Sequence, residues 1–385
     1  MTADPTTAER LPELGDPVRA VEARLLTARL PRPWGPEAPE NHVIVVTVST
    51  ESGRQGTGFA WTPTVGPTAV LAALRDDLAP RAVGLEPDPV AVWGRLWLET
   101  HEAGDGLMGI ALAGVDTALW DLRARSAEAS VAALLGASRR ALPAYGSGVN
   151  RHYPLPELVA QAERWVAAGF DAVKVKVGGR ETAEDLDRLR AVREVIGPGR
   201  ALMIDANQLW DVPAAVAAID RLAEVEPAWV EEPLLSDDLA GYRALREEVG
   251  VPIAAGENLR SRWAFERFLE AGVLDVVQPN VVRVGGITPA LEIAALVADA
   301  GARLAFHLLP ELSAPLAAAL PDAGAIEIVE DATFDRLGLV RAAPFTLAGG
   351  TLTLSDRPGL GLDFVTSVPG AAGAAGTAST GEDTR

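Results

Sequence analysis

Along the first part of the chain, apolar residues follow the two-residue alternation of strands and then the three- to four-residue spacing of helices. Helical spacing is clearest in the stretch that starts at Gly109. The strand-like stretches are residues 18–30, 41–50 and 53–62. The Pro- and Gly-rich residues 31–41 between the first two predict an exposed loop. We therefore expect residues 1–140 to form an N-terminal α+β module built on an antiparallel sheet.

From about residue 141 the pattern changes to short apolar runs that end in polar residues. About eight such runs alternate with helix-like segments, at intervals of about 20 to 30 residues. They are "PAYGSG", "AVKVKV", "ALMIDAN", "AWVEEP", "PIAAGEN", "DVVQPN", "RLAFH" and "IEIVED". This alternation predicts an α/β fold, either a (β/α)8 TIM barrel or a doubly wound sheet, and the number of strands favours a barrel over residues 141–345.

Three successive runs end in an acid, namely Asp205, Glu231 and Glu257. The carboxyl ends of barrel strands meet in one mouth, where three carboxylates repel one another unless a cation lies between them. Because all three ligands are oxygen atoms, the cation should be hard, with Mg²⁺ the first choice and Mn²⁺ the second. The alternative is that each acid caps the helix that follows it.

Lys174 and Lys176 are the only lysines among 34 basic residues, and all the others are arginines. Strand periodicity in "VKVKV" places both lysines on one face, in the strand just before the one that carries Asp205. An arginine stays protonated, whereas a desolvated lysine can lose its proton and act as a base. We infer that one lysine transfers a proton and that the other holds a substrate carboxylate. The alternative is a solvated strand with polar residues by chance.

Of the four histidines, only His307 follows a predicted barrel strand. That strand is the seventh, across the mouth from the two lysines. A lone histidine after an apolar run is often structural, but this position favours a catalytic role, since histidine is the usual acid or base near neutral pH.

Composition narrows the partners of the protein. The net charge of −19 disfavours nucleic acid and anionic lipid, and the sequence has no apolar run long enough to span a membrane. Without cysteine there are no disulfides or thiolate metal sites, and the N-terminus does not resemble a signal peptide, so we expect a cytoplasmic protein. Residues 371–385 lack core-forming side chains and are predicted to be disordered.

Taken in order, "KVKVG", "DAN", "WVEEP", "GEN", "GG" and a following His resemble the enolase superfamily, in particular its mandelate racemase-like branch. The similarity covers nearly the whole chain. "GTGFAW" and "GVDTALWDLRAR" resemble the capping domain and barrel entry of that family. "DRPGLGLDF" resembles its C-terminal return to the cap, which places that segment within residues 346–370.

This resemblance implies a set of roles for individual residues. The three acids bind Mg²⁺, which a substrate carboxylate also chelates, and Lys174 adds positive charge. Lys176 moves the α-proton on one face of the substrate and His307 works on the other. Glu327, in "IEIVE", hydrogen-bonds the developing enediolate. A divalent ion and preorganised donors would stabilise the second negative charge that forms when this proton leaves.

One position departs from the family pattern. Members pair the histidine with an aspartate at the end of the sixth strand, but this sequence has Asn280 there, in "QPNVVRVGG". An asparagine can orient the ring but supplies no charge, so we expect His307 to be a weaker base. Racemisation needs a competent base on each face, whereas dehydration can proceed with one.

Three functions therefore stay open. The first is dehydration of a sugar acid to a 2-keto-3-deoxy acid, which the asparagine favours. The second is racemisation or epimerisation of an α-hydroxy or α-amino acid derivative, and the third is a non-catalytic protein that binds metal and carboxylate. Arg32, Trp34 and Asn207 are candidate substrate contacts. Members of the branch are usually oligomeric, so we expect a homo-oligomer.

Overall fold

The computed structural model describes residues 13–35, 38–179 and 181–368. The tail predicted to be disordered, residues 371–385, lies outside the described residues. No helix within the described residues is both long and apolar enough to cross a membrane.

The first module is a three-stranded antiparallel sheet covered by helices. Its strands β1, β2 and β3 follow the predicted alternation, with the strand order β1-β2-β3. Their bounds are Val18–Arg29, Glu40–Thr50 and Gln55–Thr62. The helices are α1 (Pro67–Ala72), α2 (Ala79–Ala82), α3 (Pro89–Thr100), α4 (Leu107–Ser126) and α5 (Val131–Leu134), with a π-helical stretch at Ala73–Leu78 and a 3₁₀ turn at His101–Ala103. We call this module the cap.

The long helix α4 packs directly against β3 because two glycines in that strand allow a close approach. A Cβ atom added to Gly58 would lie 2.2 Å from the backbone nitrogen of Ala118, and Gly56 meets α4 equally closely. The middle of α4 is buried on all sides. This helix, predicted from the apolar spacing after Gly109, therefore joins the cap sheet to the barrel.

The second module is the predicted barrel, whose eight parallel strands within the described residues run in sequence order. They are β4 (Ala141–Ser147), β5 (Ala172–Lys176), β6 (Ala201–Asp205), β7 (Val230–Glu231), β8 (Ile253–Ala255), β9 (Val276–Val277), β10 (Arg303–Leu304) and β11 (Ile326–Val329). β11 pairs with β4, and a bridge from Leu304 to Ala323 links the β10 side to the approach of β11. Each strand follows one of the apolar runs, and its polar end opens onto the same rim.

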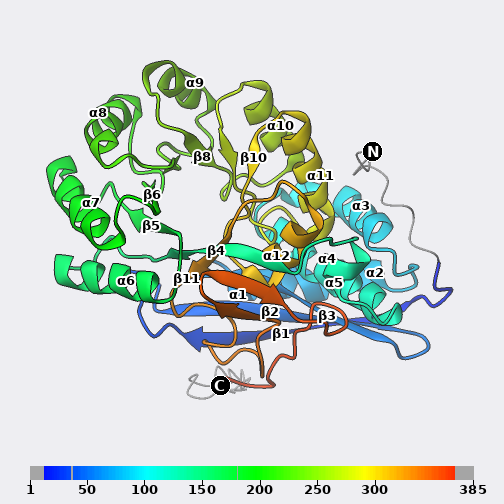
Figure 1. The fold of residues 1–385 in the computed structure, drawn as a ribbon. Coiled ribbons are helices and arrows are strands. Elements are labelled where there is room, and N and C mark those ends of the chain that lie inside the picture. Colours follow the sequence, from blue (N-terminus) through cyan, green and yellow to red (C-terminus); the bar gives the residue numbers. More distant parts are fainter. Residues whose placement is uncertain (1–12, 36–37, 180, 369–385) are drawn as a thin grey trace, which may run out of the picture.

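Helices surround these strands, as Figure 1 shows for α6 to α11, while the cap sheet lies along one side of the barrel. The helices are α6 (Leu155–Ala167), α7 (Thr182–Ile196), α8 (Val212–Leu222), α9 (Leu239–Glu248), α10 (Arg262–Glu270), α11 (Ile287–Asp299) and α12 (Pro310–Ala319), with a 3₁₀ turn at Ala223–Val225. The β-strands are buried on both faces, as parallel strands between a packed interior and a ring of helices must be.

After the barrel the chain returns to the cap. The hairpin β12 (Phe345–Ala348) and β13 (Thr351–Leu354) adds antiparallel to the start of β4. The next residues cross to α4, where the buried carboxylate of Asp121 accepts hydrogen bonds from the backbone N–H groups of Leu360 (2.6 Å) and Thr57 (2.7 Å). One side chain therefore ties together β3, α4 and the C-terminal segment.

We expect Asp121→Ala to lower the free energy of unfolding by about 3 kcal/mol, because two backbone donors would lose their acceptor and Arg125 would lose its partner. Chemical denaturation of the two proteins measures the difference. The matched control is Asp187→Ala, which removes an exposed aspartate paired with Arg190 and should change stability by less than about 0.5 kcal/mol. Equal stability of the two variants would contradict this role of Asp121.

Candidate active site

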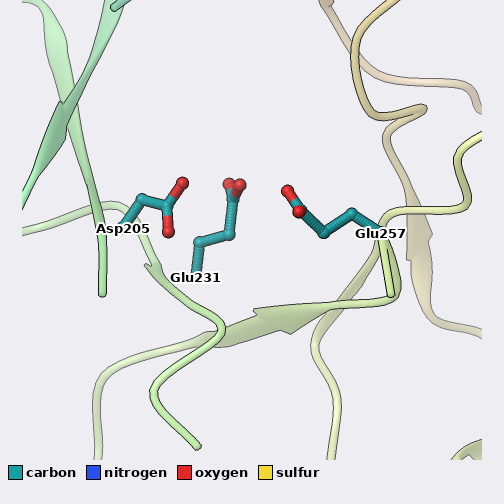
Figure 2. Close-up of side chains that lie close together, drawn as sticks. All are labelled: Asp205, Glu231 and Glu257. Carbon is teal, nitrogen blue, oxygen red and sulfur yellow. The ribbon is translucent and has the colours of Figure 1, made fainter. Parts of the chain in front are cut away.

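Asp205, Glu231 and Glu257 converge at the carboxyl ends of β6, β7 and β8. One carboxylate oxygen from each lies within 4.8 Å of the others, and all three side chains are buried. Figure 2 shows the three carboxyl groups turned toward one another. The strand register explains part of this, because Asp205 pairs with Glu231 in neighbouring parallel strands, so both point to the same side.

Glu257 reaches the same point through a backbone turn rather than through the strand itself. It follows β8 by two residues, and the intervening Gly256 has φ 137°, which side-chain-bearing residues rarely adopt. A Cβ atom at Gly256 would lie 2.9 Å from the backbone nitrogen of Gln278. Glycine at this position therefore lets the chain turn Glu257 toward the other two acids.

Lys174 lies beneath the acids and is almost fully buried. Its Nζ is 2.5 Å from Glu231 Oε1, 2.8 Å from Glu327 Oε1 and 3.7 Å from Asp205 Oδ2. Burial works against the charge of the lysine, but these carboxylates, Glu231 first, hold the pKa of Lys174 well above its usual value. Conversely, burial raises the pKa of Glu327, but Lys174, His307 and the hydrogen bond from Ser147 together outweigh it and bring that pKa down to about 2.

Lys176 lies in the same row as two of the acids, since it pairs with Asp205 in the β5–β6 register. Its Nζ donates a hydrogen bond to Asp205 Oδ2. Burial disfavours the charged amine, but Asp205, with Glu257 and Glu231, outweighs this effect and raises the pKa of Lys176. The side chain is 11% exposed, compared with 1% for Lys174, so Lys176 is the lysine that faces the open side of the mouth.

Two further cationic or polar groups contact Glu257. Arg283 Nη1 donates to its Oε1 at 3.1 Å, and His307 Nε2 lies 2.8 Å from its Oε2. The triad of acids is therefore flanked by Lys174 and Lys176 on one side and by these two residues on the other.

The hydrogen bonds of Asn280 fix the state of the His307 ring. Asn280 Oδ1 accepts from the backbone N–H groups of Val282 and Arg283, both at 3.1 Å. Its Nδ2 is therefore the atom 3.0 Å from His307 Nδ1, and it must donate to that nitrogen. We assign the neutral ring as the Nε2–H tautomer from this network, and the carboxylate of Glu257 at Nε2 agrees with it.

Several residues around the site escaped the sequence analysis. Asn150, after β4, accepts a hydrogen bond from the backbone N–H of Lys176 at 2.9 Å. Gln278 and Trp229 both donate to Glu231. Asn150 and Gln278 lie at the polar ends of barrel strands, so the sequence pattern could have identified them as site residues. Arg283 lies in a loop, where no periodic pattern could have identified it.

The candidate substrate contacts occupy different surroundings. Arg32 Nη1 is 2.6 Å from Glu157 Oε1, so its charge already has a partner on α6. Trp34 packs edge-on against Trp61 of the cap, with ring centroids 6.3 Å apart. Asn207 lies beside the acids, and its backbone N–H donates to Asp205 Oδ1 at 2.8 Å.

The donor set fits a hard divalent cation. All candidate ligand atoms are carboxylate oxygens, the type that Mg²⁺ and Mn²⁺ prefer, and no cysteine or histidine belongs to the cluster. Burial raises the pKa of Glu231 to about 8, although Lys174 opposes it, so packing three ionised acids here has an electrostatic cost. A divalent cation would remove that cost.

Comparison with protein families agrees with this geometry. Residues 157–368 match the family described as enolase C-terminal domain-like, and residues 37–136 match the mandelate racemase/muconate lactonizing enzyme N-terminal domain. The chain belongs to the mandelate racemase/muconate lactonizing enzyme family of the enolase superfamily. The resemblance inferred from the sequence motifs is thereby confirmed.

Curated relatives of this family member include two enzymes of sugar-acid metabolism. It is 34% identical to the 3,6-anhydro-alpha-L-galactonate cycloisomerase of Streptomyces coelicolor, over 84% of this chain and 89% of that protein. It is 33% identical to the L-talarate/galactarate dehydratase of Salmonella typhimurium, over 83% of this chain and 79% of that protein.

Solved structures of the family also superpose closely. A Streptomyces coelicolor racemase with bound magnesium has a TM-score of 0.85 and 31% identity, covering 90% of this chain and 97% of its own. An L-talarate dehydratase from Polaromonas, complexed with Mg and L-glucarate, has a TM-score of 0.82 and 33% identity, covering 91% and 96%. The predicted fold class, a modified barrel with a cap, is confirmed. The predictions that the cofactor is magnesium and that the protein is an enzyme of this superfamily are confirmed as well.

We expect the protein to bind one Mg²⁺ and Glu231→Gln to weaken that binding at least about 100-fold, because the variant removes a ligand and a negative charge. Isothermal titration calorimetry of the metal-free protein gives both affinities. Glu224→Gln, which changes an exposed glutamate paired with Arg190, is the matched control and should bind as the unaltered protein does. Unchanged affinity in the Glu231 variant would exclude this glutamate as a ligand.

Proposed function

We propose that the protein is a Mg²⁺-dependent dehydratase of a sugar acid, which it converts to a 2-keto-3-deoxy acid. The dehydratases among its relatives act on hydroxylated carboxylic acids, and the barrel mouth contains the groups that removal of an α-proton requires. In this proposal Asp205, Glu231 and Glu257 hold the ion, and Lys176 is the base.

The observation that favours dehydration over racemisation is the Asn280–His307 hydrogen bond. With a proton on Nε2 and Asn280 donating to Nδ1, neither nitrogen of the ring has a free lone pair. An imidazolium would also place an N–H against the amide N–H of Asn280. His307 therefore serves as a hydrogen-bond donor and not as a second base. One base suffices for dehydration but not for a two-base inversion.

The proton balance closes with Lys176 alone. An ion held by Asp205 would offset the carboxylate charge that keeps Lys176 protonated. The neutral amine of Lys176 then takes the α-proton, and the electron pair of the C–H bond enters the substrate carboxylate to form the enediolate. When the enediolate collapses, the β-hydroxyl leaves and takes the proton back from the Lys176 ammonium, which yields water and the enol. If Glu257 holds the ion, the Nε2–H of His307 that now faces Glu257 would be free to donate a hydrogen bond to the leaving hydroxyl. The enol then becomes the 2-keto acid, and no external acid or oxidant is needed.

The surrounding residues prepare this step. A bound Mg²⁺ supplies positive charge to the substrate carboxylate, which carries a second negative charge once the α-proton has left. Lys174, held between Glu231 and Glu327, adds a cation beside the same carboxylate. Glu327 also accepts the backbone N–H of Leu308 at 3.0 Å, which places it next to His307. We propose that it bonds the enediolate as the protonated acid, once the substrate carboxylate has replaced it as the partner of Lys174, because an ionised carboxylate has no hydrogen to donate.

Substrate recognition and assembly are further parts of the proposal. We infer that Asn207 contacts the reacting end of the substrate because it adjoins Asp205, and that Arg32 and Trp34 of the cap side approach its distal end. A homo-oligomer and a cytoplasmic location stay predictions. The two alternative functions are racemisation of a related acid, and binding of metal and carboxylate without turnover. The following experiments would reveal either one.

Incubation with Mg²⁺ and a panel of aldonates and aldarates should yield 2-keto acids, detected as semicarbazones. Lys176→Arg should lower kcat about 10³-fold, because an arginine keeps the positive charge but cannot take up a proton. Its Mg²⁺ affinity, measured in parallel, shows whether the site is intact. A panel without any product would contradict the proposal, as would full activity of the arginine variant.

In D₂O the protein should not exchange the α-hydrogen of its substrate with inversion, since only one face has a base. Asn280→Asp should introduce that exchange, because the aspartate accepts from Nδ1–H and frees the Nε2 lone pair. Nuclear magnetic resonance of recovered substrate detects both deuterium and epimer. Inversion by the unaltered protein at a rate comparable to dehydration would show that His307 already acts as a base.

A further inference from the structure

The two oxygens of the Glu231 carboxylate have different partners. Oε1 faces Lys174 Nζ at 2.5 Å. Oε2 accepts two hydrogen bonds, from Gln278 Nε2 at 2.7 Å and from Trp229 Nε1 at 3.2 Å. Glu231 and Gln278 are both fully buried, so water does not compete for these contacts. The carboxylate therefore cannot rotate without breaking at least one of them.

Both donors are themselves held in place. Trp229 precedes Glu231 by two residues at β7, so the two side chains point to the same side, and the indole packs edge-on against Tyr145 with centroids 6.1 Å apart. Gln278 follows β9 directly, and its backbone N–H donates to Ala255 O at 2.9 Å. The barrel wall thus fixes the indole of Trp229 and the backbone from which the Gln278 side chain extends.

The segment that carries Gln278 also carries Asn280. Residues two apart in an extended segment point to the same side. Each of these amides donates one N–H to a residue of the site, Gln278 to Glu231 and Asn280 to His307. The end of the sixth barrel strand therefore orients one group on each side of the mouth.

We propose that Gln278 and Trp229 are positioning residues that hold Oε2 of Glu231 away from the ion, so that this glutamate binds Mg²⁺ through Oε1 alone. The inference rests on the proposed metal site. Mg²⁺ requires near-ideal octahedral geometry, whereas Ca²⁺ accepts more ligands and bidentate carboxylates. A glutamate restricted to one oxygen favours the smaller ion, and loss of the restriction lets the carboxylate rotate into a bidentate arrangement.

The test uses Gln278→Met, which keeps the length of the side chain without a donor, and Trp229→Phe, which keeps an aromatic ring without the N–H. Titration calorimetry of the metal-free proteins measures Mg²⁺ and Ca²⁺ affinities. Each variant should bind Mg²⁺ at least about 10-fold more weakly, in the range of 10–100-fold seen when partners of metal ligands are removed. The ratio of Mg²⁺ to Ca²⁺ affinity should fall in both.

The matched control comes from α6, where Trp165 is a buried tryptophan. Trp165→Phe should leave both affinities within about twofold of the unaltered protein, the scatter expected away from the site. Circular dichroism confirms folding, and if one variant at the site fails to fold, the other still decides the matter.

A folded Gln278 or Trp229 variant with unchanged Mg²⁺ affinity would overturn the inference. An equal loss of both affinities, with the ratio preserved, would overturn it too, because a merely structural effect does not discriminate between the ions. No substrate is present, so the outcome does not depend on sugar-acid dehydration. If the Glu231→Gln variant binds Mg²⁺ as well as the unaltered protein does, the proposed metal site itself is wrong. If Glu231→Gln loses Mg²⁺ binding while the Gln278 and Trp229 variants keep it, only the positioning inference is wrong.

Discussion

The mutual repulsion of three carboxylates in a buried barrel mouth is the constraint on which the rest of the site depends. One carboxylate oxygen each of Asp205, Glu231 and Glu257 lies within 4.8 Å of the others, and burial raises the pKa of Glu231 to about 8. Such a cluster is stable only where cations surround it. Lys174 and Lys176 supply charge from β5, and the proposed ion completes the balance. The buried carboxylates that lower the stability of the fold are therefore the same groups that would hold the ion.

The amide side chains at the end of the sixth barrel strand shape that chemistry without contributing charge. Asn280 leaves His307 with a donor at Nε2, and this restricts the proposed proton transfer to Lys176. Gln278 similarly leaves Glu231 with one oxygen for the ion. In both cases a neutral N–H group decides which atom of a neighbouring residue remains available. A single aspartate in place of Asn280 would change the number of bases in the mouth.

The fold and the three acids at the strand ends could be predicted from the sequence because both depend on periodic patterns. Parallel strands place their last residues at one rim, so Asp205 and Glu231 could be placed together from strand ends alone. The two lysines stood out because the chain otherwise uses arginine. Arg283 and the direction of the Asn280 amide could not be predicted, because a loop and two backbone N–H groups determine them. The left-handed turn at Gly256 likewise has no periodic signature.

The most direct measurement of the central claim is a crystal structure of the protein with Mn²⁺ in place of Mg²⁺ and a bound hydroxy acid, in which anomalous scattering locates the ion. The account predicts one strong peak at coordination distance from Asp205, Glu231 and Glu257. It also predicts that Lys176 faces the α-carbon and that His307 Nε2 faces the β-hydroxyl. A peak elsewhere in the barrel, or an α-carbon turned toward His307 instead of Lys176, would contradict it.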